Sequence, residues 1–375
     1  MGAPYIANAA YEHMMRGRQD ITTGECVMSE ATPQKYFEED KLAAWMADQI
    51  EGFEGPISVD KFPGGQSNPT FKISTEKKNY VLRRKPPGQL LKGAHAVDRE
   101  HRIISALGTV GFPVPKTYAL CQDPDVMDAD FYIMDMVEGR IFWDTSFPEV
   151  PTEDRRKYFD AMNDTIARLH NVDYEAIGLG DYGRPGNYFE RQIGRWSKQY
   201  LQDEIAGRVP EMDNLVEWLP KNIPAGDETT LVHGDYRCDN MIFHPTEPRV
   251  IAVLDWELST LGHPIGDFTY HLMAFRMPKG LSTSLSDCNF DEMNIPTEEE
   301  YVQAYCERTG RSGIDNLDFY LAFNMFRLAA IIHGVKGRML KGNASNAKAA
   351  ATAARLEPLA KAAWAQAEAA MKKNG

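Results

Sequence analysis

The sequence predicts an α+β chain with two lobes, a small lobe built on an antiparallel sheet and a larger, mainly helical lobe. Three observations support this. The 375 residues exceed what a single core usually covers. β-like segments gather between residues 56 and 138, and amphipathic helical patterns dominate beyond Gly139. We therefore expect an N-terminal extension over residues 1–33, an N-lobe over 34–138 and a C-lobe over 139–375.

The N-lobe pattern predicts a five-stranded sheet with helices. An amphipathic helix within 38–51 precedes the β-like segments ISVDKF, PTFKIST and NYVLRR. The segment AHAVDREHRIISALGTVG has the apolar spacing and terminal glycines of a helix. Two more strands are predicted by KTYALCQD and DFYIMDMVEG.

The C-lobe pattern predicts a series of helices. The first begins at Thr152, which we expect to act as its N-terminal cap. Further helices are predicted over 187–204, 264–275, 297–310 and 316–340. Residues on the first two of these helices could line an acceptor site or could equally be core or surface residues: Tyr188, Arg191, Trp196 and Tyr270. The Ala-rich final stretch, 346–373, retains several large apolar residues, which favours a packed terminal helix over a tail.

Composition narrows the possible partners and compartment. The formal net charge is −13, and no block of Lys or Arg suggests binding to nucleic acid or to an anionic membrane. The five cysteines are widely separated and form no CxxC, so neither disulfides nor a zinc site is indicated. No run approaches 18 apolar residues, and the first 20 residues lack the apolar core of an export signal. We expect a soluble cytoplasmic protein with a small-molecule partner.

The segment LVHGDYRCDNMIFHPTEPRVIAVLDWE, residues 231–257, carries the strongest chemical signal. Asp235 and Asn240 have the spacing of the kinase loop HRDxxxxN, in which the aspartate accepts the proton of the acceptor hydroxyl and the asparagine binds magnesium. Asp255 follows the strand-like VIAVL and corresponds to the second metal-binding aspartate of kinases. His-Gly-Asp alone is also compatible with a turn, but the combination favours phosphoryl transfer. We predict Asp235 as the general base and Asn240 and Asp255 as ligands of Mg²⁺.

Three neighbours of this loop have open roles. Arg237 could stabilise negative charge on the transferred phosphoryl group, or it could form a surface ion pair with Asp239. His233 is expected to orient the loop through hydrogen bonds. Asp267 could cap the helix predicted around it or brace the loop from below, and we favour a structural role.

A nucleotide site is predicted in the N-lobe. The loop FPGGQSNPTF between the first two strands offers backbone amides and side-chain donors for phosphates, although an ordinary hairpin turn is also possible. Strand alternation places Val81 and Arg83 on one face, and we assign Arg83 as the phosphate anchor. Glu100 is its expected partner, or a solvated helix charge. The expected nucleotide-binding residues are Gly64, Gly65, Gln66, Ser67, Asn68, Arg83 and Glu100, with the adenine-binding hinge at Met134, Asp135, Met136 and Val137.

These motifs together resemble the aminoglycoside phosphotransferase and choline kinase-like superfamily over about residues 35 to 340. They are most similar to the kinase-like domain that occurs alone in bacteria and ahead of an acyl-CoA dehydrogenase in animals, the family member 10 and 11 type. The resemblance implies a protein-kinase-like fold, ATP with Mg²⁺, and phosphorylation of a small-molecule hydroxyl. For the closest relatives it implies hydroxyacyl-CoA thioesters as acceptors.

The sequence departs from the superfamily pattern in two places. The anchor is Arg83 rather than lysine, and His263 stands where many relatives have an acidic residue. Two other functions stay open: an aminoglycoside or amino-sugar kinase, which the acidic composition permits, and a nucleotide-binding pseudokinase. Retention of Asp235, Asn240 and Asp255 together argues against the pseudokinase.

Overall fold

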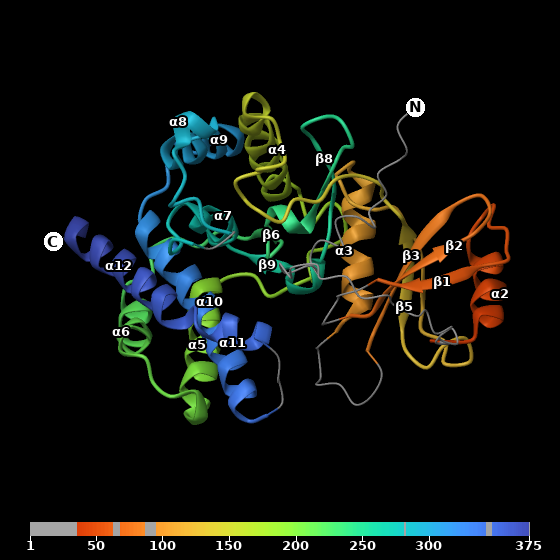
Figure 1. Ribbon diagram of the computed structural model, residues 1–375, viewed down its shortest axis with the longest axis horizontal. Helices are drawn as coiled ribbons and strands as arrows, with labels where there is room; N and C mark the ends of the chain where they lie inside the picture. The colour runs from red at the N-terminus through yellow and green to blue at the C-terminus, as the bar shows by residue number, and fades with distance from the viewer. Residues whose placement is uncertain (1–35, 63–67, 87–94, 281–282, 343–346, 375) are drawn as a thin grey trace, which may run out of the picture. The chain divides into compact units, whose positions relative to one another are not determined.

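The predicted α+β fold class is confirmed by the computed structural model, which describes residues 36–62, 68–86, 95–280, 283–342 and 347–374 (Figure 1). The chain forms two compact units. The first combines residues up to Ile141 with Met241–Glu257, and the second combines Phe142–Asn240 with Leu258–Gly375. The expected N-lobe, 34–138, therefore lies in the first unit, but residues 241–257 from the expected C-lobe pack there as well.

An antiparallel five-stranded sheet organises the first unit. Its order is β1-β2-β3-β5-β4. The strands are β1 (Ser58–Lys61), β2 (Thr70–Ser74), β3 (Asn79–Arg84), β4 (Thr117–Cys121) and β5 (Phe131–Asp135). In this register Arg83 lies opposite Thr70 on one side and Tyr132 on the other. The candidate anchor is therefore on the central strand.

The two faces of this sheet meet different helices (Figure 1). Helix α2 (Glu39–Gln49) packs Leu42 and Met46 against Ile73 and Leu82, and all four side chains are fully buried. Helix α3 (Val97–Thr109) packs against β4 and β5. Because side chains alternate along β3, Leu82 joins the α2 core while Arg83 points to the opposite face, where it meets Glu100 of α3.

A second hairpin completes the first unit. Its strands are β7 (Met241–Phe243) and β8 (Val250–Val253). The backbones of Phe243 and Arg140 exchange two 2.8 Å hydrogen bonds. A Cβ atom on Gly139 would lie 2.3 Å from the carbonyl oxygen of Phe243, so only glycine allows the two backbones to come this close. These long-range pairings explain why residues 241–257 belong to the first unit.

The second unit is mainly helical around a short antiparallel pair, β6 (Thr230–Val232) and β9 (Thr260–Gly262). Its helices are α4 (Thr152–His170), α5 (Tyr188–Gln202), α6 (Pro210–Trp218), α7 (Pro264–Leu272), α8 (Phe290–Met293), α9 (Glu298–Thr309), α10 (Leu317–Leu340), α11 (Ala347–Ala353) and α12 (Leu356–Asn374). Helices α10 and α12 form its most extensive helix pair. The Ala-rich C-terminal stretch is packed, as expected, but it forms two helices, α11 and α12, rather than one.

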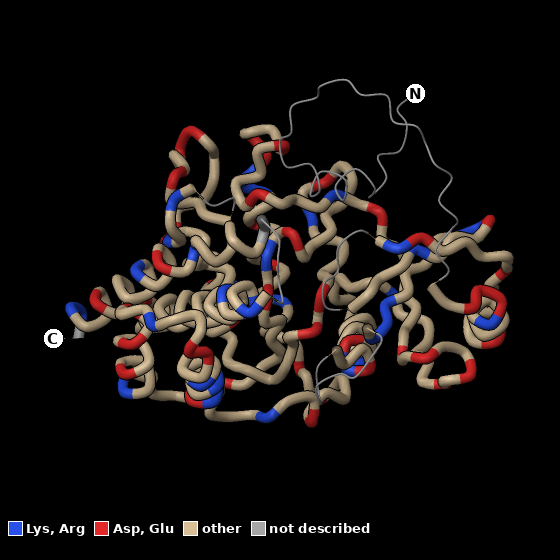
Figure 2. The backbone as a smooth tube through the Cα atoms, turned by 60° about the horizontal axis from the view of Figure 1, so that its bottom comes forward, with Lys and Arg blue, Asp and Glu red and all other residues tan. Residues whose placement is uncertain are grey.

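The N-terminus of α4 differs from the sequence-based expectation. Thr152 is the first helical residue of α4 and Pro151 occupies the cap position, so the predicted threonine cap is wrong. Acidic and basic residues are interspersed along the described chain rather than gathered in one basic block (Figure 2). In the part of the chain that the structure describes, no helix has the length and hydropathy needed to cross a bilayer.

Candidate active site

The loop that carries Asp235 is held from α7. The buried carboxylate of Asp267 accepts hydrogen bonds from the backbone N–H of His233 at 2.7 Å and of Gly234 at 2.8 Å. Burial opposes the charge of Asp267, but His170 and the N–H of His233 keep its pKa below the usual value. Of the two roles considered for Asp267, bracing is therefore the one the structure shows. The cap of α7 is His263, which accepts from the N–H of Ile265.

Gly234 replaces the arginine of the kinase motif for a steric reason. Its φ is +84°, in the region that favours glycine. A Cβ atom here would also lie 2.8 Å from the carbonyl oxygen of Leu258. Any side chain at this position would displace the backbone immediately before Asp235. The expected orienting role of His233 is also seen, because its Nδ1 accepts from the N–H of Asp235 at 3.2 Å.

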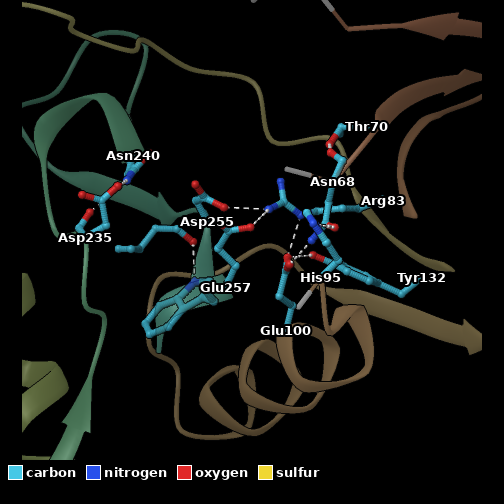
Figure 3. Close-up of polar contacts among 12 residues, drawn as sticks. Asn68, Thr70, Arg83, His95, Glu100, Tyr132, Asp235, Asn240, Asp255 and Glu257 are labelled. Atoms are coloured by element: carbon cyan, nitrogen blue, oxygen red, sulfur yellow. Dashed lines mark hydrogen bonds and ion pairs between the residues drawn. The ribbon is translucent and has the colours of Figure 1, made fainter. Parts of the chain in front are cut away.

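Three side chains surround the carboxylate of Asp235. The hydroxyl of Tyr270 donates to Oδ1 at 2.6 Å, and Nε of Arg237 lies 3.3 Å from the same oxygen. The amide of Asn240 donates to Oδ2 at 3.1 Å and to the carbonyl oxygen of Asp235 at 2.9 Å (Figure 3). Since both bonds use Nδ2, Oδ1 of Asn240 remains available as a metal ligand. An oriented carboxylate of this kind can accept a proton from an alcohol.

Arg237 contacts both neighbouring carboxylates. Its Nη2 lies 3.1 Å from Asp239, so the ion pair considered from the sequence exists alongside the contact with Asp235. Burial opposes the positive charge, but Asp235 and Asp239 outweigh this effect and raise the pKa of Arg237. The side chain is 38% exposed, so it remains accessible to a bound anion.

A pocket in the second unit adjoins this group. It encloses about 530 Å³ free of protein atoms, part of it open to solvent. Its walls are largely apolar, with Asp239 as the acidic residue among them. The lining residues are Trp143, Thr145, Arg237, Cys238, Asp239, Tyr270, His271, Met273, Ala274, Met277, Thr283 and Leu328. Of the four residues suggested from sequence as possible acceptor contacts, Tyr270 lines this pocket, and Tyr188, Arg191 and Trp196 do not.

In the first unit, Arg83 joins two carboxylates (Figure 3). Its Nε lies 2.6 Å from Glu100, and its Nη2 lies 2.6 Å from Asp255. Glu257 is more distant, at 3.9 Å. Burial opposes the charge of Arg83, but Glu100 and the other carboxylates raise its pKa. The planar fork of arginine allows one side chain to contact both acids.

Glu100 is the centre of a buried polar network. It is 1% exposed, so the alternative of a solvated helix charge is wrong. It accepts from Asn68 at 2.6 Å and from Tyr132 at 3.2 Å, and His95 contacts Asn68 at 3.1 Å. Burial raises the pKa of Glu100, and Arg83 opposes this effect. The network thus links the end of the predicted phosphate loop to α3. The other predicted loop residues, Gly64, Gly65, Gln66 and Ser67, lie outside the described residues.

Asp255 adopts an unusual backbone conformation. Its φ of +63° is uncommon for a residue with a side chain, and such positions often occur at functional sites. The next residue, Trp256, is 1% exposed, donates from Nε1 to the carbonyl oxygen of Val253 at 2.9 Å and packs edge-on against Phe112. These contacts fix the turn that presents Asp255 to Arg83.

The hinge segment offers backbone groups at two residues. The N–H of Asp135 donates to the carbonyl oxygen of Lys116 at 2.8 Å, and its side chain pairs with Lys78 and Tyr118. Within the described residues, Met136 and Val137 form no such hydrogen bonds. Of the four expected hinge residues, these two can therefore present free backbone groups to an adenine edge. Met134 is largely buried in β5.

Each predicted metal ligand, taken within its own unit, presents an oxygen suited to magnesium. In the second unit Asn240 has an amide oxygen that its hydrogen bonds do not use, and in the first unit Asp255 has a partly exposed carboxylate that also pairs with Arg83. Hard cations such as Mg²⁺ prefer oxygen ligands. No cluster of three or more His, Cys, Asp or Glu that could hold a metal is found within the described ranges. Mg²⁺ does not require one, because it keeps several waters and binds substrate phosphates with one or two protein carboxylates.

Sequence reasoning missed part of the support around Asp235. The sequence suggests Tyr270 only as a possible acceptor contact and gives Arg327 of α10 no predicted role. Arg327 is 6% exposed and donates to the carbonyl oxygen of Gly234 at 2.6 Å. The available signal was an arginine in the middle of a predicted, strongly apolar helix, where a charge needs a specific partner.

The pattern of the phosphotransferase enzyme family matches residues 58–320. Acyl-CoA dehydrogenase family member 11 from Homo sapiens is 40% identical over 344 residues, which are 90% of this chain and 44% of that protein. Family member 10 from Mus musculus is 43% identical over 312 residues, 83% of this chain and 29% of that protein. The chain thus spans less than half the length of these relatives.

Solved structures show the same fold. A candidate aminoglycoside phosphotransferase from Ralstonia eutropha is 49% identical, with a TM-score of 0.83 over 88% of this chain and 98% of that one. A spectinomycin phosphotransferase, solved in complex with ADP and spectinomycin, has 13% identity and a TM-score of 0.59 over 88% of this chain and 99% of that one. At that identity the second likeness shows the fold alone.

Proposed function

Because the chain belongs to the phosphotransferase enzyme family, we propose that it is an ATP- and Mg²⁺-dependent small-molecule kinase that phosphorylates the hydroxyl of a hydroxyacyl-CoA or related hydroxy acid. The observation that carries the proposal is the placement of Asp235. Its carboxylate is hydrogen-bonded to Tyr270, which lines the apolar pocket. An alcohol on an apolar chain in this pocket would lie near a suitable base.

The reaction assigned to this site is transfer of the γ-phosphoryl group of ATP. The acceptor hydroxyl oxygen forms a bond to the γ-phosphorus, the bond from that phosphorus to the bridging oxygen of ADP breaks, and the hydroxyl proton passes to Asp235. Arg237 is the cation nearest to Asp235 among the described contacts and is assigned to the charge of the transferred group. Asn240 and Asp255 would hold Mg²⁺, which would neutralise charge on the phosphates.

Arg83 is assigned to the phosphates of ATP. A guanidinium can bind phosphate oxygens while it stays paired with a carboxylate, and Glu100 provides that fixed pair. The ADP complex of the spectinomycin phosphotransferase, which shares this fold, supports the use of an adenine nucleotide.

The pocket favours an apolar acceptor over an aminoglycoside. A polycationic amino sugar requires several carboxylates, whereas among the described lining residues Asp239 alone carries one, and it is already paired with Arg237. Apolar walls formed by residues such as Trp143, Met273 and Leu328 suit an aliphatic chain. The relatives named as acyl-CoA dehydrogenases are consistent with an acyl substrate. We also test phosphorylation of aminoglycosides, because the similar structure from Ralstonia eutropha is named as an aminoglycoside phosphotransferase.

An ADP-release assay across an acceptor panel tests this function. The panel contains 3- and 4-hydroxyacyl-CoA thioesters, the matching free hydroxy acids, thioesters without a hydroxyl, and kanamycin. We expect Mg²⁺-dependent turnover with hydroxylated acyl compounds only, and mass spectrometry should show one added phosphate per acceptor. Turnover with kanamycin alone would replace the proposal by the amino-sugar kinase. ATP binding without turnover on any acceptor would support the pseudokinase.

A further inference from the structure

Arg327 is a buried charge that the reaction described above does not use. It lies on α10 and is 6% exposed. Among the described residues no carboxylate forms an ion pair with it, and its buried Nε has no hydrogen-bond partner. Burying an unpaired guanidinium costs free energy, so its remaining contacts must offset part of that cost.

Two contacts of Arg327 lead toward Asp235, through Gly234 and through Tyr270. Its Nη2 donates to the carbonyl oxygen of Gly234, the residue directly before Asp235, at 2.6 Å. Its guanidinium carbon lies 5.0 Å from the ring centre of Tyr270 and 5.9 Å from that of Trp196, within the range of cation–π attraction. Tyr270 in turn donates its hydroxyl hydrogen bond to Asp235.

We propose that Arg327 is a positioning residue that holds Asp235 in its reactive geometry, through the carbonyl of Gly234 and through the ring of Tyr270. The proposal rests on the assignment of Asp235 as the base. Asp267 secures the backbone N–H groups of His233 and Gly234 from α7, and Arg327 secures the following carbonyl group from α10. Two elements that are distant in sequence thus fix the same peptide segment.

The positively charged side chain also fits this role better than an apolar one would. A carbonyl oxygen buried beside the loop needs a donor, and a charged donor makes a stronger bond than a neutral one. Since Arg327 does not line the pocket, it acts through Gly234 and Tyr270 rather than on the acceptor itself.

Two substitutions of Arg327 and a control on the same helix test the proposal. Arg327→Met removes the donor and the charge but keeps an unbranched apolar side chain. Arg327→Lys keeps a cation that can donate to the Gly234 carbonyl. Ala329→Gly weakens α10 two residues further on, about 200° around the helix, and serves as the control for a general loss of stability. We expect kcat per folded enzyme to fall about 10- to 100-fold in Arg327→Met, because small displacements of catalytic groups have effects of this size.

The pattern across variants separates positioning from stability. The KM for ATP should remain unchanged, Arg327→Lys should recover part of kcat, and Ala329→Gly should keep the kcat of the parent enzyme. Tyr270→Phe, which keeps the ring beside Arg327 but loses the bond to Asp235, should also lower kcat. A folded Arg327→Met enzyme with the parent kcat would overturn the proposal.

Hydrogen–deuterium exchange gives a readout that needs no acceptor. The amides of His233, Gly234, Asp235 and Asn240 are all hydrogen-bonded, so a peptide covering 233–240 reports opening of the loop. We expect faster exchange of this peptide in Arg327→Met and not in Ala329→Gly. If the parent enzyme phosphorylates no acceptor, the proposed function fails while this measurement still tests Arg327. Equal exchange in the two variants would refute the positioning role.

Discussion

The guanidinium of Arg83 lies 2.6 Å from Asp255 and, through a different nitrogen, 2.6 Å from Glu100. These acids come from segments far apart in the sequence: Asp255 follows β8 and Glu100 belongs to α3. A lysine ammonium is a point charge and lacks the two-sided planar geometry of this contact. The arginine found where kinases have lysine therefore permits a contact that joins the anchor to a proposed metal ligand.

Replacing Arg83 should weaken nucleotide use. We expect Arg83→Lys to raise the KM for ATP about tenfold, equivalent to roughly 1.4 kcal/mol, and Arg83→Met to raise it further. The matched control is Arg84→Lys, because Arg84 points to the other face of the sheet and pairs with Asp128. Steady-state kinetics with varied ATP provide the measurement. An unchanged KM in Arg83→Met would contradict the anchor assignment.

Neutralising Asp235 should affect turnover far more than binding. Asp235→Asn keeps the size of the side chain but removes the base, and loss of a general base typically lowers the rate about 100- to 10,000-fold. Calorimetric titration should still detect ATP binding, because the nucleotide contacts are assigned to other residues. Undiminished kcat in this variant would rule out Asp235 as the base.

Asn240→Ala should increase the demand for metal. The variant loses the free amide oxygen assigned to Mg²⁺ and also the amide bonds to Asp235. We expect a higher Mg²⁺ concentration at half-maximal turnover together with a lower kcat. EDTA should abolish turnover of the parent enzyme, and added Mg²⁺ should restore it. A variant with the parent Mg²⁺ dependence would show that Asn240 acts on Asp235 alone.

Filling the pocket should impair acceptor binding selectively. Ala274 is 8% exposed and lines the pocket, so Ala274→Leu places extra volume within it. We expect the KM for the acceptor to rise, most strongly for longer acyl chains, while the KM for ATP is unchanged. Ala304→Leu on α9, outside the pocket lining, is the control. Equal effects on all chain lengths would place the acyl chain elsewhere.

Acidification should destabilise the fold through His263. Burial is the main cause that lowers the pKa of His263 to about 4, with Arg311 also acting against the charge and Glu228 opposing it. Its ordinary value is 6.5, so between pH 6.5 and 4 the unfolded chain binds the proton more readily. The stabilisation is present above pH 6.5 and is lost as the pH falls toward 4. The expected loss between pH 7 and 5 is roughly 2 kcal/mol.

Urea denaturation at several pH values measures this effect. His263→Asn keeps a side chain that can cap α7 by accepting from the N–H of Ile265, but it does not titrate. The variant should therefore show a shallower fall in the free energy of unfolding. His271, whose pKa burial also lowers to about 4, should supply part of the pH dependence that remains. An identical pH profile for the variant would exclude His263 as a contributor.

Several parts of the candidate site could be predicted from the sequence because they depend on short segments of the chain. The spacing of Asp235 and Asn240, the strand leading to Asp255, and the alternation that separates Arg83 from Arg84 are all properties of short segments. The pairing of Arg83 with Glu100 also followed from a strand and a helix of predictable type. By contrast, the role of Gly234 depends on the approach of Leu258, and the left-handed φ of Asp255 depends on the turn anchored by Trp256.

The fold class, the order of the strands and helix between residues 56 and 138, and the residue types available for phosphoryl transfer could be predicted from sequence, because periodicity and motif spacing act over a few turns of chain. Folding adds what no short segment encodes: β7 and β8 pack with the first unit, Asp267 braces the loop, and Tyr270 and Arg327 support Asp235. The physical reason is that a buried hydrogen bond or ion pair needs two partners at a fixed distance. When those partners are separated by 35 residues, as Asp235 and Tyr270 are, or by 172, as Arg83 and Asp255 are, folding of the intervening chain sets the distance.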